Sequence, residues 1–363
     1  MTTATASAAG REAVRPRTAV VVGAGAVGSF LGGTLASAGW DVTLLGRQAG
    51  GAAAATQSVP SSLLIDGPEG RRTVPVRRIA DPAAGPPSPD LVILAVKAFD
   101  LGGALDAAAS WPDAPVMTVQ NGVGAEAEAA AARTSPLIAA SLTTAVEPID
   151  GGVARRRRGG IGLAPVRGDV RNLVHELADA FADGGLPTAV CADPASMKWS
   201  KLLANLVGNA SAAILAVDPG AVWADRSGFD LERRQLREAV AVMRALGLDV
   251  VSLPGAGVGL LLTGLRFPAI VARPIMSAFI GRARGGKAPS LLLGMRAGGG
   301  RTEARWLNGA VADAGAGAGV ATPVNACLAM LVDRIAADPP EGAAWSGDPG
   351  RLLAATRAWP DGR

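Results

Sequence analysis

Tyrosine is absent from the 363-residue chain, and histidine occurs only once, at His175. Without tyrosine a tyrosine–lysine proton relay is excluded, and one histidine cannot form a multi-histidine metal site. His175 lies in the amphipathic stretch RNLVHELADAFAD, which predicts an exposed helical position away from the other candidate catalytic residues. The chemistry is therefore expected to use neither a metal ion nor a histidine acid.

Cysteine is nearly as scarce, and Cys191 and Cys327 are far apart without metal-ligand spacing. Such cysteines predict unpaired core thiols in a reducing cytoplasm. The N-terminus lacks the basic start and apolar core of an export signal, so residues 1–16 are expected to be a disordered lead-in. The apolar run from Val251 to Leu265 is too short for a bilayer span and contains glycine and proline, so no membrane partner is expected.

Aromatic residues make up only 4% of the sequence, although the net charge is +4. The one dense basic run, Arg155–Arg158, has glycines on both sides, which predicts a solvated β-hairpin turn. A protein that binds RNA or DNA normally combines a basic patch with stacking aromatic residues. No nucleic-acid partner is therefore expected.

Glycine, in contrast, is abundant, and its spacing near the N-terminus is informative. Residues 17–47, RTAVVVGAGAVGSFLGGTLASAGWDVTLLGR, predict a strand, a glycine turn, a helix and a second strand. In the GxGxxG spacing the first glycine permits the turn, the second admits a pyrophosphate and the third lets helix and strand touch. The phosphates would meet free N–H groups at the helix N-terminus. We therefore predict a dinucleotide site, rather than an incidental turn, at Gly23, Ala24, Gly25, Ala26, Val27 and Gly28.

The end of the second strand distinguishes between the two nicotinamide dinucleotides. An acidic residue there would bind a ribose 2′-hydroxyl, but the strand runs into Gly46 and Arg47. Because a guanidinium suits a 2′-phosphate, the sequence favours NADP(H) over NAD(H). The alternative is an exposed arginine that only ends the strand.

Two further apolar segments, DLVILAVK ending at Lys97 and APVMTVQN ending at Asn121, predict parallel strands covered on both faces. Ligands of open parallel sheets bind beyond the carboxyl ends of the strands. Lys97 and Asn121 are therefore expected at the nicotinamide cleft. The alternative is a solvent-facing lysine and an asparagine that caps a helix.

The pattern becomes helical after this α/β region. We predict a Rossmann-type domain over residues 17–193, a helical substrate and catalytic domain over 194–338, and a loosely ordered tail over 339–363.

Lys201, Asn205 and Asn209 have the spacing i, i+4 and i+8, which predicts one face of a helix in the second domain. That helix is otherwise apolar, so its polar groups need partners. A lysine in such surroundings has its pKa lowered toward the range where it can release a proton. The alternatives are a lysine that reaches solvent and asparagines that tie helices together.

Taken together, these stretches resemble the ketopantoate reductase (2-dehydropantoate 2-reductase) family. The resemblance extends from about Arg17 to Ala337 and rests on GAGAVGSFLGGTLASAGWDVTLLGR, AVKAFD, VQNGVGAE, KWSKLLANLVGNA, GGKAPSLLLGMRAGGGRTEARWLNGAV and GVATPVN. It implies an NADPH-binding Rossmann domain and an all-α C-terminal domain like that of 6-phosphogluconate dehydrogenase. It also implies hydride delivery to the ketone carbon of a small 2-oxo acid in pantothenate biosynthesis. Homodimers formed through the helical domain are common in that family.

The resemblance assigns catalytic roles to two residues. Lys201 matches the family's catalytic lysine, the general acid that protonates the developing alkoxide. Glu303 matches the glutamate that binds the substrate hydroxyl and supports that lysine, although a residue in TEARWLNGAV could instead cap a helix. An ammonium group both stabilises negative charge on the carbonyl oxygen and supplies the proton. The chain departs from the family at Gly294, where many members have aspartate.

The resemblance also implies a set of binding residues. The implied substrate contacts are Asn121, Asn205, Asn209 and Ser290, and the implied cofactor contacts are Asn121, Lys97 at the cofactor edge and Arg47 at the 2′-phosphate.

Two other functions remain open at this point. One is a 3-hydroxy acid dehydrogenase of the broader group that has a lysine with asparagine four residues on, as in KLLAN. The other is a non-catalytic NADP(H)-binding sensor, against which the intact polar set around Lys201 argues. The combination of Glu303 and Ser290 favours 2-dehydropantoate reduction over the 3-hydroxy acid dehydrogenase.

Overall fold

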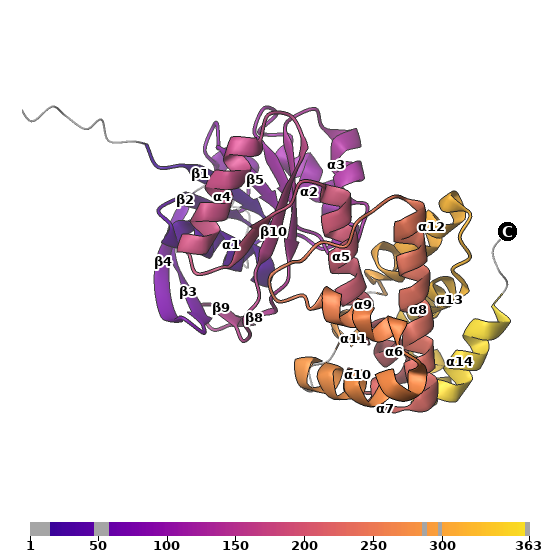
Figure 1. The fold of residues 1–363 in the computed structure, drawn as a ribbon. Helices are drawn as coiled ribbons and strands as arrows, with labels where there is room; N and C mark the ends of the chain where they lie inside the picture. Colours follow the sequence, from indigo (N-terminus) through magenta and orange to yellow (C-terminus); the bar gives the residue numbers. More distant parts are fainter. Residues whose placement is uncertain (1–14, 47–57, 285–288, 297–299, 360–363) are drawn as a thin grey trace, which may run out of the picture.

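The computed structural model describes residues 15–46, 58–284, 289–296 and 300–359. Figure 1 shows a β-sheet covered by helices, followed in the chain by a helical part on the other side of the molecule. This is the predicted architecture of a Rossmann-type domain followed by an all-α domain. Residues 1–14 of the predicted lead-in lie outside the described residues.

The centre of the sheet is parallel. β1 (Thr18–Val22) pairs with β2 (Asp41–Leu45) on one side and with β5 (Leu91–Leu94) on the other. β6 (Val116–Thr118) and β7 (Leu137–Leu142) continue the parallel pairing beyond β5. Within the described ranges the strand order is β11-β10-β7-β6-β5-β1-β2-β4-β3-β9-β8. The carboxyl ends of the central strands therefore lie along one edge.

The outer strands add antiparallel pairs. β3 (Val59–Gly67) and β4 (Gly70–Ile79) form a hairpin. Another hairpin joins β8 (Val146–Ile149) to β9 (Gly152–Arg155). β10 (Ile161–Arg167) is antiparallel to β7 but parallel to β11 (Thr188–Val190).

The prediction of a hairpin turn at Arg155–Arg158 is wrong. The turn of the β8–β9 hairpin lies before this run, at residues 150–151, and Arg155 ends β9. The Arg155 side chain is buried and forms an ion pair with Glu69 and a hydrogen bond to the carbonyl of Gly185. Only residues 156–158 of the run are exposed. A buried arginine with a carboxylate partner cannot be recognised from a run of like charges.

Alternate side chains of β1 pack in two cores, one on each face of the sheet. Val21 lies in the core formed with α1 (Ala26–Ser37) and α4 (Arg171–Asp183). Val20 and Val22 lie in the core formed with α2 (Leu101–Ala108) and α3 (Ala125–Ala132). Because both faces are covered, the strands read as continuous apolar runs. His175 is exposed on α4, as predicted.

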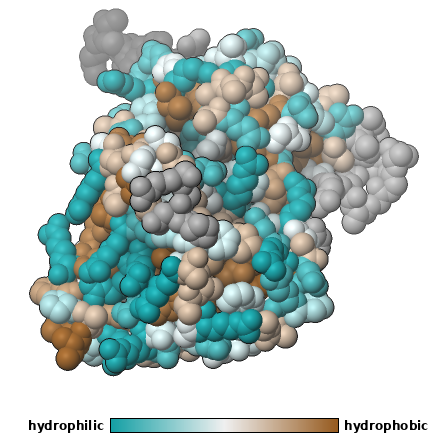
Figure 2. Space-filling model, turned by 90° about the vertical axis from the view of Figure 1, so that its right-hand side faces the viewer, coloured by the Kyte–Doolittle hydropathy of each residue, from teal (hydrophilic) through white to brown (hydrophobic). Residues whose placement is uncertain are grey.

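The helical part has a separate core that contains Trp223 and Phe229, whose rings meet edge to face with centroids 5.6 Å apart. Its α-helices are α5 (Pro194–Leu206), α6 (Ala210–Leu215), α7 (Pro219–Ala224), α8 (Arg226–Ala245), α9 (Val258–Arg266), α10 (Ala269–Arg284), α11 (Ser290–Arg296), α12 (Asn308–Ala318), α13 (Pro323–Ala337) and α14 (Pro349–Ala358). Short 3₁₀ turns, η4 (Ala304–Trp306) and η5 (Pro339–Ala344), lie between them. Figure 2 shows the outer side of this part, where hydrophilic and hydrophobic residues are interspersed. Over the described ranges, no helix is both long and apolar enough to cross a membrane.

The C-terminal segment corrects the prediction of a loosely ordered tail after residue 338. α14 packs against α8 and α13, and its Leu352 and Leu353 are buried in the helical core. The polar and proline-containing residues of this segment define where α14 begins. The Asp348 carboxylate accepts a hydrogen bond from Arg351 N, and Pro349 occupies the first turn.

Both cysteines are unpaired and buried, as predicted. Burial raises the pKa of each thiol, that of Cys327 to about 11.

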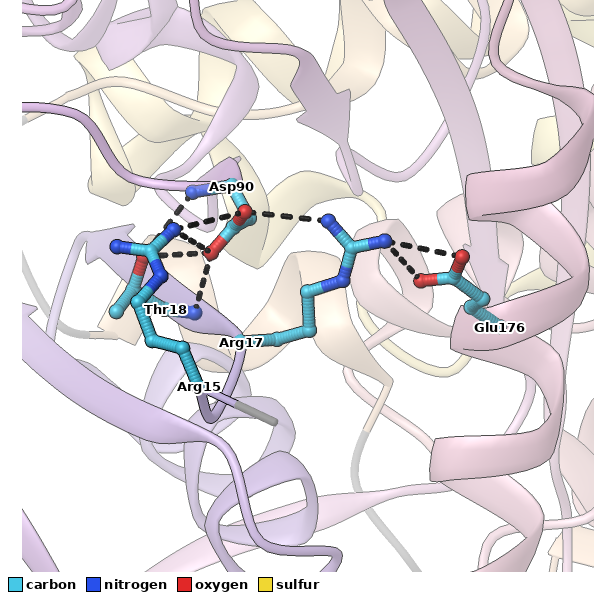
Figure 3. Close-up of polar contacts among 5 residues, drawn as sticks. All are labelled: Arg15, Arg17, Thr18, Asp90 and Glu176. Atoms are coloured by element: carbon cyan, nitrogen blue, oxygen red, sulfur yellow. Dashed lines mark hydrogen bonds and ion pairs between the residues drawn. The ribbon is translucent and has the colours of Figure 1, made fainter. Parts of the chain in front are cut away.

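At the amino ends of the strands, a polar network fastens the start of β1 (Figure 3). Asp90 accepts hydrogen bonds from Thr18 N at 2.8 Å and from Arg17 at 3.1 Å, and Arg17 also contacts Glu176 of α4 at 2.7 Å. Partial burial acts to raise the pKa of Asp90, but these hydrogen bonds outweigh it and lower the pKa. This edge lies opposite the carboxyl ends of the strands.

Candidate active site

The glycine turn between β1 and α1 has the geometry that its spacing predicts. Gly23 has φ +104°, and a Cβ there would lie 2.8 Å from the carbonyl oxygen of Ala95. A Cβ at Gly28 would lie 2.0 Å from the carbonyl oxygen of Gly23, so only glycine allows this approach of helix and strand.

Gly25 differs from both of these glycines, because a Cβ on it would meet no atom within 4 Å. It is exposed and occupies the N-cap of α1 without a capping side chain, and the first helical turn has no acidic residue. Open space above free N–H groups at a helix N-terminus suits an anion. The turn from Gly23 to Gly28 therefore fits a pyrophosphate. The predicted 2′-phosphate residue, Arg47, lies outside the described residues.

Lys97 and Asn121 occupy equivalent positions at the neighbouring carboxyl ends. Lys97 follows the last residue of β5 by three positions, and Asn121 follows the last residue of β6 by three. β5 and β6 are adjacent and parallel, so the predicted juxtaposition at the edge is confirmed. Both residues are exposed, and neither ends its strand as the sequence suggested.

Helix α5 brings the lysine of the helical part to this edge. Its start is defined by Asp193, whose carboxylate accepts hydrogen bonds from Ala195 N and Ser196 N, and by Pro194 in the first turn. One face of α5 is buried through Leu202, Leu203 and Leu206.

Lys201 Nζ donates a hydrogen bond to Asn205 Oδ1 at 2.8 Å, one helical turn away. Asn205 Nδ2 in turn donates to Asn121 Oδ1 at 3.3 Å. These bonds form a continuous polar series from α5 to the carboxyl edge of the sheet. Lys201 and Asn205 are partly buried, so the series is accessible from one side.

Asn209 does not share a helix with this series, which corrects the predicted i, i+4, i+8 face. α5 ends at Leu206, Gly208 has φ +55°, and a new helix begins at Ala210. Glycine permits this left-handed backbone, which turns the chain at the point where an uninterrupted helix was expected.

Asn209 is only 3% exposed and is engaged with α11. Its Nδ2 donates to Ser290 Oγ at 3.2 Å, and its Oδ1 accepts from Leu291 N at 3.2 Å. The structure thus brings Asn209 and Ser290 together, in a pair that ties two helical segments. Near them, a Cβ at Gly294 would meet no atom within 4 Å, so crowding does not explain the glycine at that position.

Glu303 forms the second connection between the two halves. It is 7% exposed, and Lys97 Nζ lies 2.8 Å from its Oε2. Glu303 occupies the N-cap position of η4, as the alternative of a helix start expected, but its carboxylate makes no capping hydrogen bond; Thr302 Oγ1 accepts one from Ala304 N at 3.1 Å instead. The residues stand 206 positions apart in sequence.

The loop after β6 also touches η4 directly. Val123 N donates to the carbonyl oxygen of Trp306 at 3.0 Å, and a Cβ at Gly122 would lie 2.1 Å from that same oxygen. Gly122 has φ +85°, so both its backbone angle and its clearance require glycine. The VQNG stretch is thereby held against the helical part.

Three polar residues that the sequence did not single out lie beneath the series. Lys198, Gln120 and Glu126 are buried or nearly so, and Lys198 contacts the other two. The available signals were weak: Lys198 stands three residues before Lys201, and Gln120 directly precedes Asn121.

Comparisons with known proteins agree on one family. The model of ketopantoate reductase PanE/ApbA matches residues 19–165, and that of ketopantoate reductase PanE/ApbA C terminal matches residues 193–336. A 2-dehydropantoate 2-reductase from Halobacterium salinarum is 32% identical over 318 residues, which span 86% of this chain and 97% of that protein. One from Pyrococcus horikoshii is 34% identical over 206 residues, or 56% of this chain and 65% of that protein.

Solved structures show the same fold. A PanE/ApbA family ketopantoate reductase from Ralstonia eutropha has a TM-score of 0.71 at 26% identity, and the match covers 89% of this chain and 99% of that one. D-mandelate dehydrogenase, solved with NADH and anilino(oxo)acetate, has a TM-score of 0.69 at 20% identity over 88% of this chain and 98% of its own.

Proposed function

Because the chain belongs to the ketopantoate reductase PanE/ApbA family, we propose that it reduces a 2-oxo acid with NADPH, and that the substrate is 2-dehydropantoate, which becomes pantoate. The family consists of oxidoreductases that act on a CH–OH group, and the named relatives are 2-dehydropantoate 2-reductases. The observation that carries the proposal is the series Lys201–Asn205–Asn121, which joins α5 to the carboxyl edge of the sheet.

The residues of the glycine turn would hold the cofactor. The clearance above Gly25 and the free helix N-terminus suit its pyrophosphate, and Arg47 is proposed for the 2′-phosphate that distinguishes NADP(H). Ala24, Ala26 and Val27 complete this turn, and Lys97 and Asn121 are proposed at the nicotinamide end. When bound, NADPH supplies the hydride that converts the ketone carbon into CH–OH.

Lys201 is proposed as the general acid. Its ammonium group would hydrogen-bond to the substrate ketone oxygen, stabilise the negative charge that develops there and donate a proton to it. Asn205 supports this role because its amide oxygen accepts a hydrogen bond from Lys201 Nζ and orients it. Its amide nitrogen is engaged with Asn121, so the lysine and the sheet edge are aligned together.

The remaining predicted residues would bind the substrate. Glu303 is proposed to accept a hydrogen bond from the substrate hydroxyl, and its contact with Lys97 links this function to the cofactor side. Asn209 and Ser290 are proposed as further substrate contacts, and Ser290 is the exposed member of this pair.

A test of the function follows NADPH oxidation by absorbance with 2-dehydropantoate and a panel of other branched 2-oxo acids, with NADH as the alternative cofactor. Turnover with 2-dehydropantoate and a preference for NADPH would support the proposal. Oxidation of 3-hydroxy acids with NADP⁺, without 2-oxo acid reduction, would instead identify a 3-hydroxy acid dehydrogenase. NADPH binding without turnover on any acid would identify a cofactor-binding sensor.

We also propose that the protein acts as a cytoplasmic homodimer in pantothenate biosynthesis. The unpaired thiols of Cys191 and Cys327 suit a reducing compartment. Helix α10 exposes several large apolar side chains, a surface that monomeric proteins rarely present and that a second copy of the chain could cover. These side chains are Ile270, Val271, Ile275 and Phe279.

A further inference from the structure

Lys198 is a buried lysine for which the proposed chemistry has no use. It lies on α5 three residues before Lys201, and it is only 3% exposed. Residues three apart on a helix are neighbours that point in somewhat different directions. Lys198 points to the sheet, whereas Lys201 joins the polar series with Asn205.

The ammonium group of Lys198 contacts three elements of the sheet domain. It donates to the carbonyl oxygen of Gln120 at 2.7 Å and to that of Ala140 on β7 at 3.4 Å. It also forms an ion pair with Glu126 of α3, with an N–O distance of 3.0 Å. The same Glu126 oxygen accepts a hydrogen bond from Thr118 at 2.9 Å. Lysine is rarely buried without partners, and here the partners are complete.

Gln120 extends these contacts to a fourth element. Its side-chain Nε2 donates to the carbonyl oxygen of Leu94 at 2.7 Å and to that of Val96 at 3.2 Å, and its Oε1 accepts from Val119 N at 3.1 Å. Gln120 is 3% exposed, so these bonds are sheltered from water. The loop after β5 is thereby tied to the loop after β6.

Each anchored backbone position lies beside a residue of the proposed site. Val96 directly precedes Lys97, Gln120 directly precedes Asn121, and Lys198 lies within one helical turn of Lys201. We propose that Lys198, acting through Gln120, is a positioning residue that sets the distances among Lys97, Asn121 and Lys201. This inference rests on the proposed function for its kinetic consequence, but the network itself does not depend on the substrate.

The alternative is a contact that only stabilises the fold. Removal of Lys198 leaves Glu126 as a carboxylate without its cation and the Gln120 carbonyl without a donor. The unpaired charge of Glu126 would lower the stability of the fold, whereas the lost hydrogen bond to Gln120 would affect the position of the loop that carries Asn121. A second substitution separates them, because Glu126→Gln removes the orphaned charge but does not restore the ammonium group that donates to the Gln120 carbonyl.

The experiment compares Lys198→Met, Glu126→Gln and the double variant with a matched control, Ser200→Ala. Ser200 is also buried on α5, but it is two positions from Lys198 and so lies on another face of the helix, where its Oγ accepts a hydrogen bond from Val251 N. Measurements are kcat and KM, the isotope effect on kcat with NADPH deuterated at the transferred position, melting temperature, and hydrogen exchange of residues 94–97 and 119–123.

In Lys198→Met we expect kcat to fall on the order of 10²-fold, as a misplacement of about 1 Å can cause. The isotope effect should rise because hydride transfer becomes the slow step, and both segments should exchange faster than in Ser200→Ala. The double variant should recover melting temperature but not kcat. Recovery of kcat in parallel with melting temperature, or hydrogen exchange of both segments equal to that of Ser200→Ala, would show that Lys198 only stabilises the fold.

Other results also decide the question. If Lys198→Met does not fold, the Glu126→Gln variant alone tests the proposal, because it leaves the Lys198–Gln120 bond in place. Its kcat should stay within a few-fold of wild type. A large loss of kcat in Glu126→Gln would contradict the proposal. If the wild type turns over no 2-oxo acid, the proposed function fails, and hydrogen exchange alone tests the positioning. Exchange equal to that of Ser200→Ala would then overturn it.

Discussion

At the scale of single residues, the proposed chemistry depends on one ammonium group that is held in place by an amide. Lys201 contacts Asn205 on its own helix, and Asn205 contacts Asn121 on the loop after β6. A lysine without such a partner would retain its rotamer freedom. It would then lose this conformational entropy each time it bound a substrate oxygen.

Replacement of Lys201 by alanine should reduce kcat by on the order of 10²- to 10⁴-fold, because the general acid and its charge are both lost. NADPH affinity should change little, since the glycine turn is untouched. Steady-state kinetics and a fluorescence titration with NADPH measure the two effects, with Ser200→Ala as the control for a change on the same helix. A variant that retains most of its kcat would remove Lys201 from the mechanism.

Asp90 gives a residue-scale prediction for stability against pH. Its pKa is lowered in the folded protein, so its contribution to stability is fully present above the unfolded pKa, near 4, and is lost as the pH falls through the lower folded value. Asp90→Asn should therefore lower the melting temperature at pH 7, and the difference from wild type should shrink as the pH falls below about 4.

Melting temperatures between pH 7 and pH 3 test this prediction. Asp113→Asn, on an exposed position of the same domain, is the matched control and should change little. A difference between wild type and Asp90→Asn that stays constant over the whole range would contradict the assignment.

At the scale of elements, the β1–α1 turn places two different demands on glycine. Gly28→Ala should destabilise the fold and abolish NADPH binding, because its Cβ would lie 2.0 Å from a backbone oxygen. Gly25→Ala should leave the melting temperature close to wild type, since no atom lies within 4 Å, but should weaken NADPH binding by crowding the pyrophosphate.

Gly103→Ala is the control for this pair, because Gly103 is an exposed helical glycine of α2 with open space around it. It should raise stability slightly, by roughly 0.5–1 kcal/mol, without changing NADPH affinity. Thermal melts and isothermal titration with NADPH distinguish the three variants. Unchanged NADPH affinity in Gly25→Ala would argue against a pyrophosphate at this turn.

At the scale of the whole molecule, the apolar face of α10 bears on assembly. Val271, Ile275 and Phe279 follow the spacing i, i+4 and i+8, and Ile275 is 62% exposed. If a second copy covers this face, Ile275→Glu should convert a dimer into a monomer, because a carboxylate would be buried without a partner.

Light scattering after gel filtration at micromolar concentration measures the mass of each variant. Val190→Glu is the matched control, since Val190 is also an exposed apolar residue but lies on β11 in the sheet domain. A monomeric wild type, or a dimer that persists in Ile275→Glu, would exclude α10 as the interface.

Much of the sheet domain follows from the sequence alone, because its requirements are local. The backbone angle of Gly23 and the clearance at Gly28 act within a few residues, and continuous apolar runs reveal strands that are covered on both faces. The edge position of Lys97 and Asn121 followed from strand parallelism, a rule of topology that needs no coordinates.

The rest was decided by packing between segments that are distant in sequence. Helical periodicity placed Asn209 beside Asn205, but the left-handed backbone at Gly208 turned it toward Ser290 instead. The Lys97–Glu303 ion pair joins residues 206 positions apart.

The burial of Lys198 shows why such contacts cannot be predicted from the sequence. A lysine can be buried only where partners surround its charge, and those partners come from the loop after β6, from α3 and from β7. No local pattern around Lys198 reveals them. The sequence by itself thus determined the central parallel strands and the glycine turn that they carry. Only the tertiary structure decided where α5 breaks, that the C-terminal segment packs as a helix, and which polar side chains meet between the two halves.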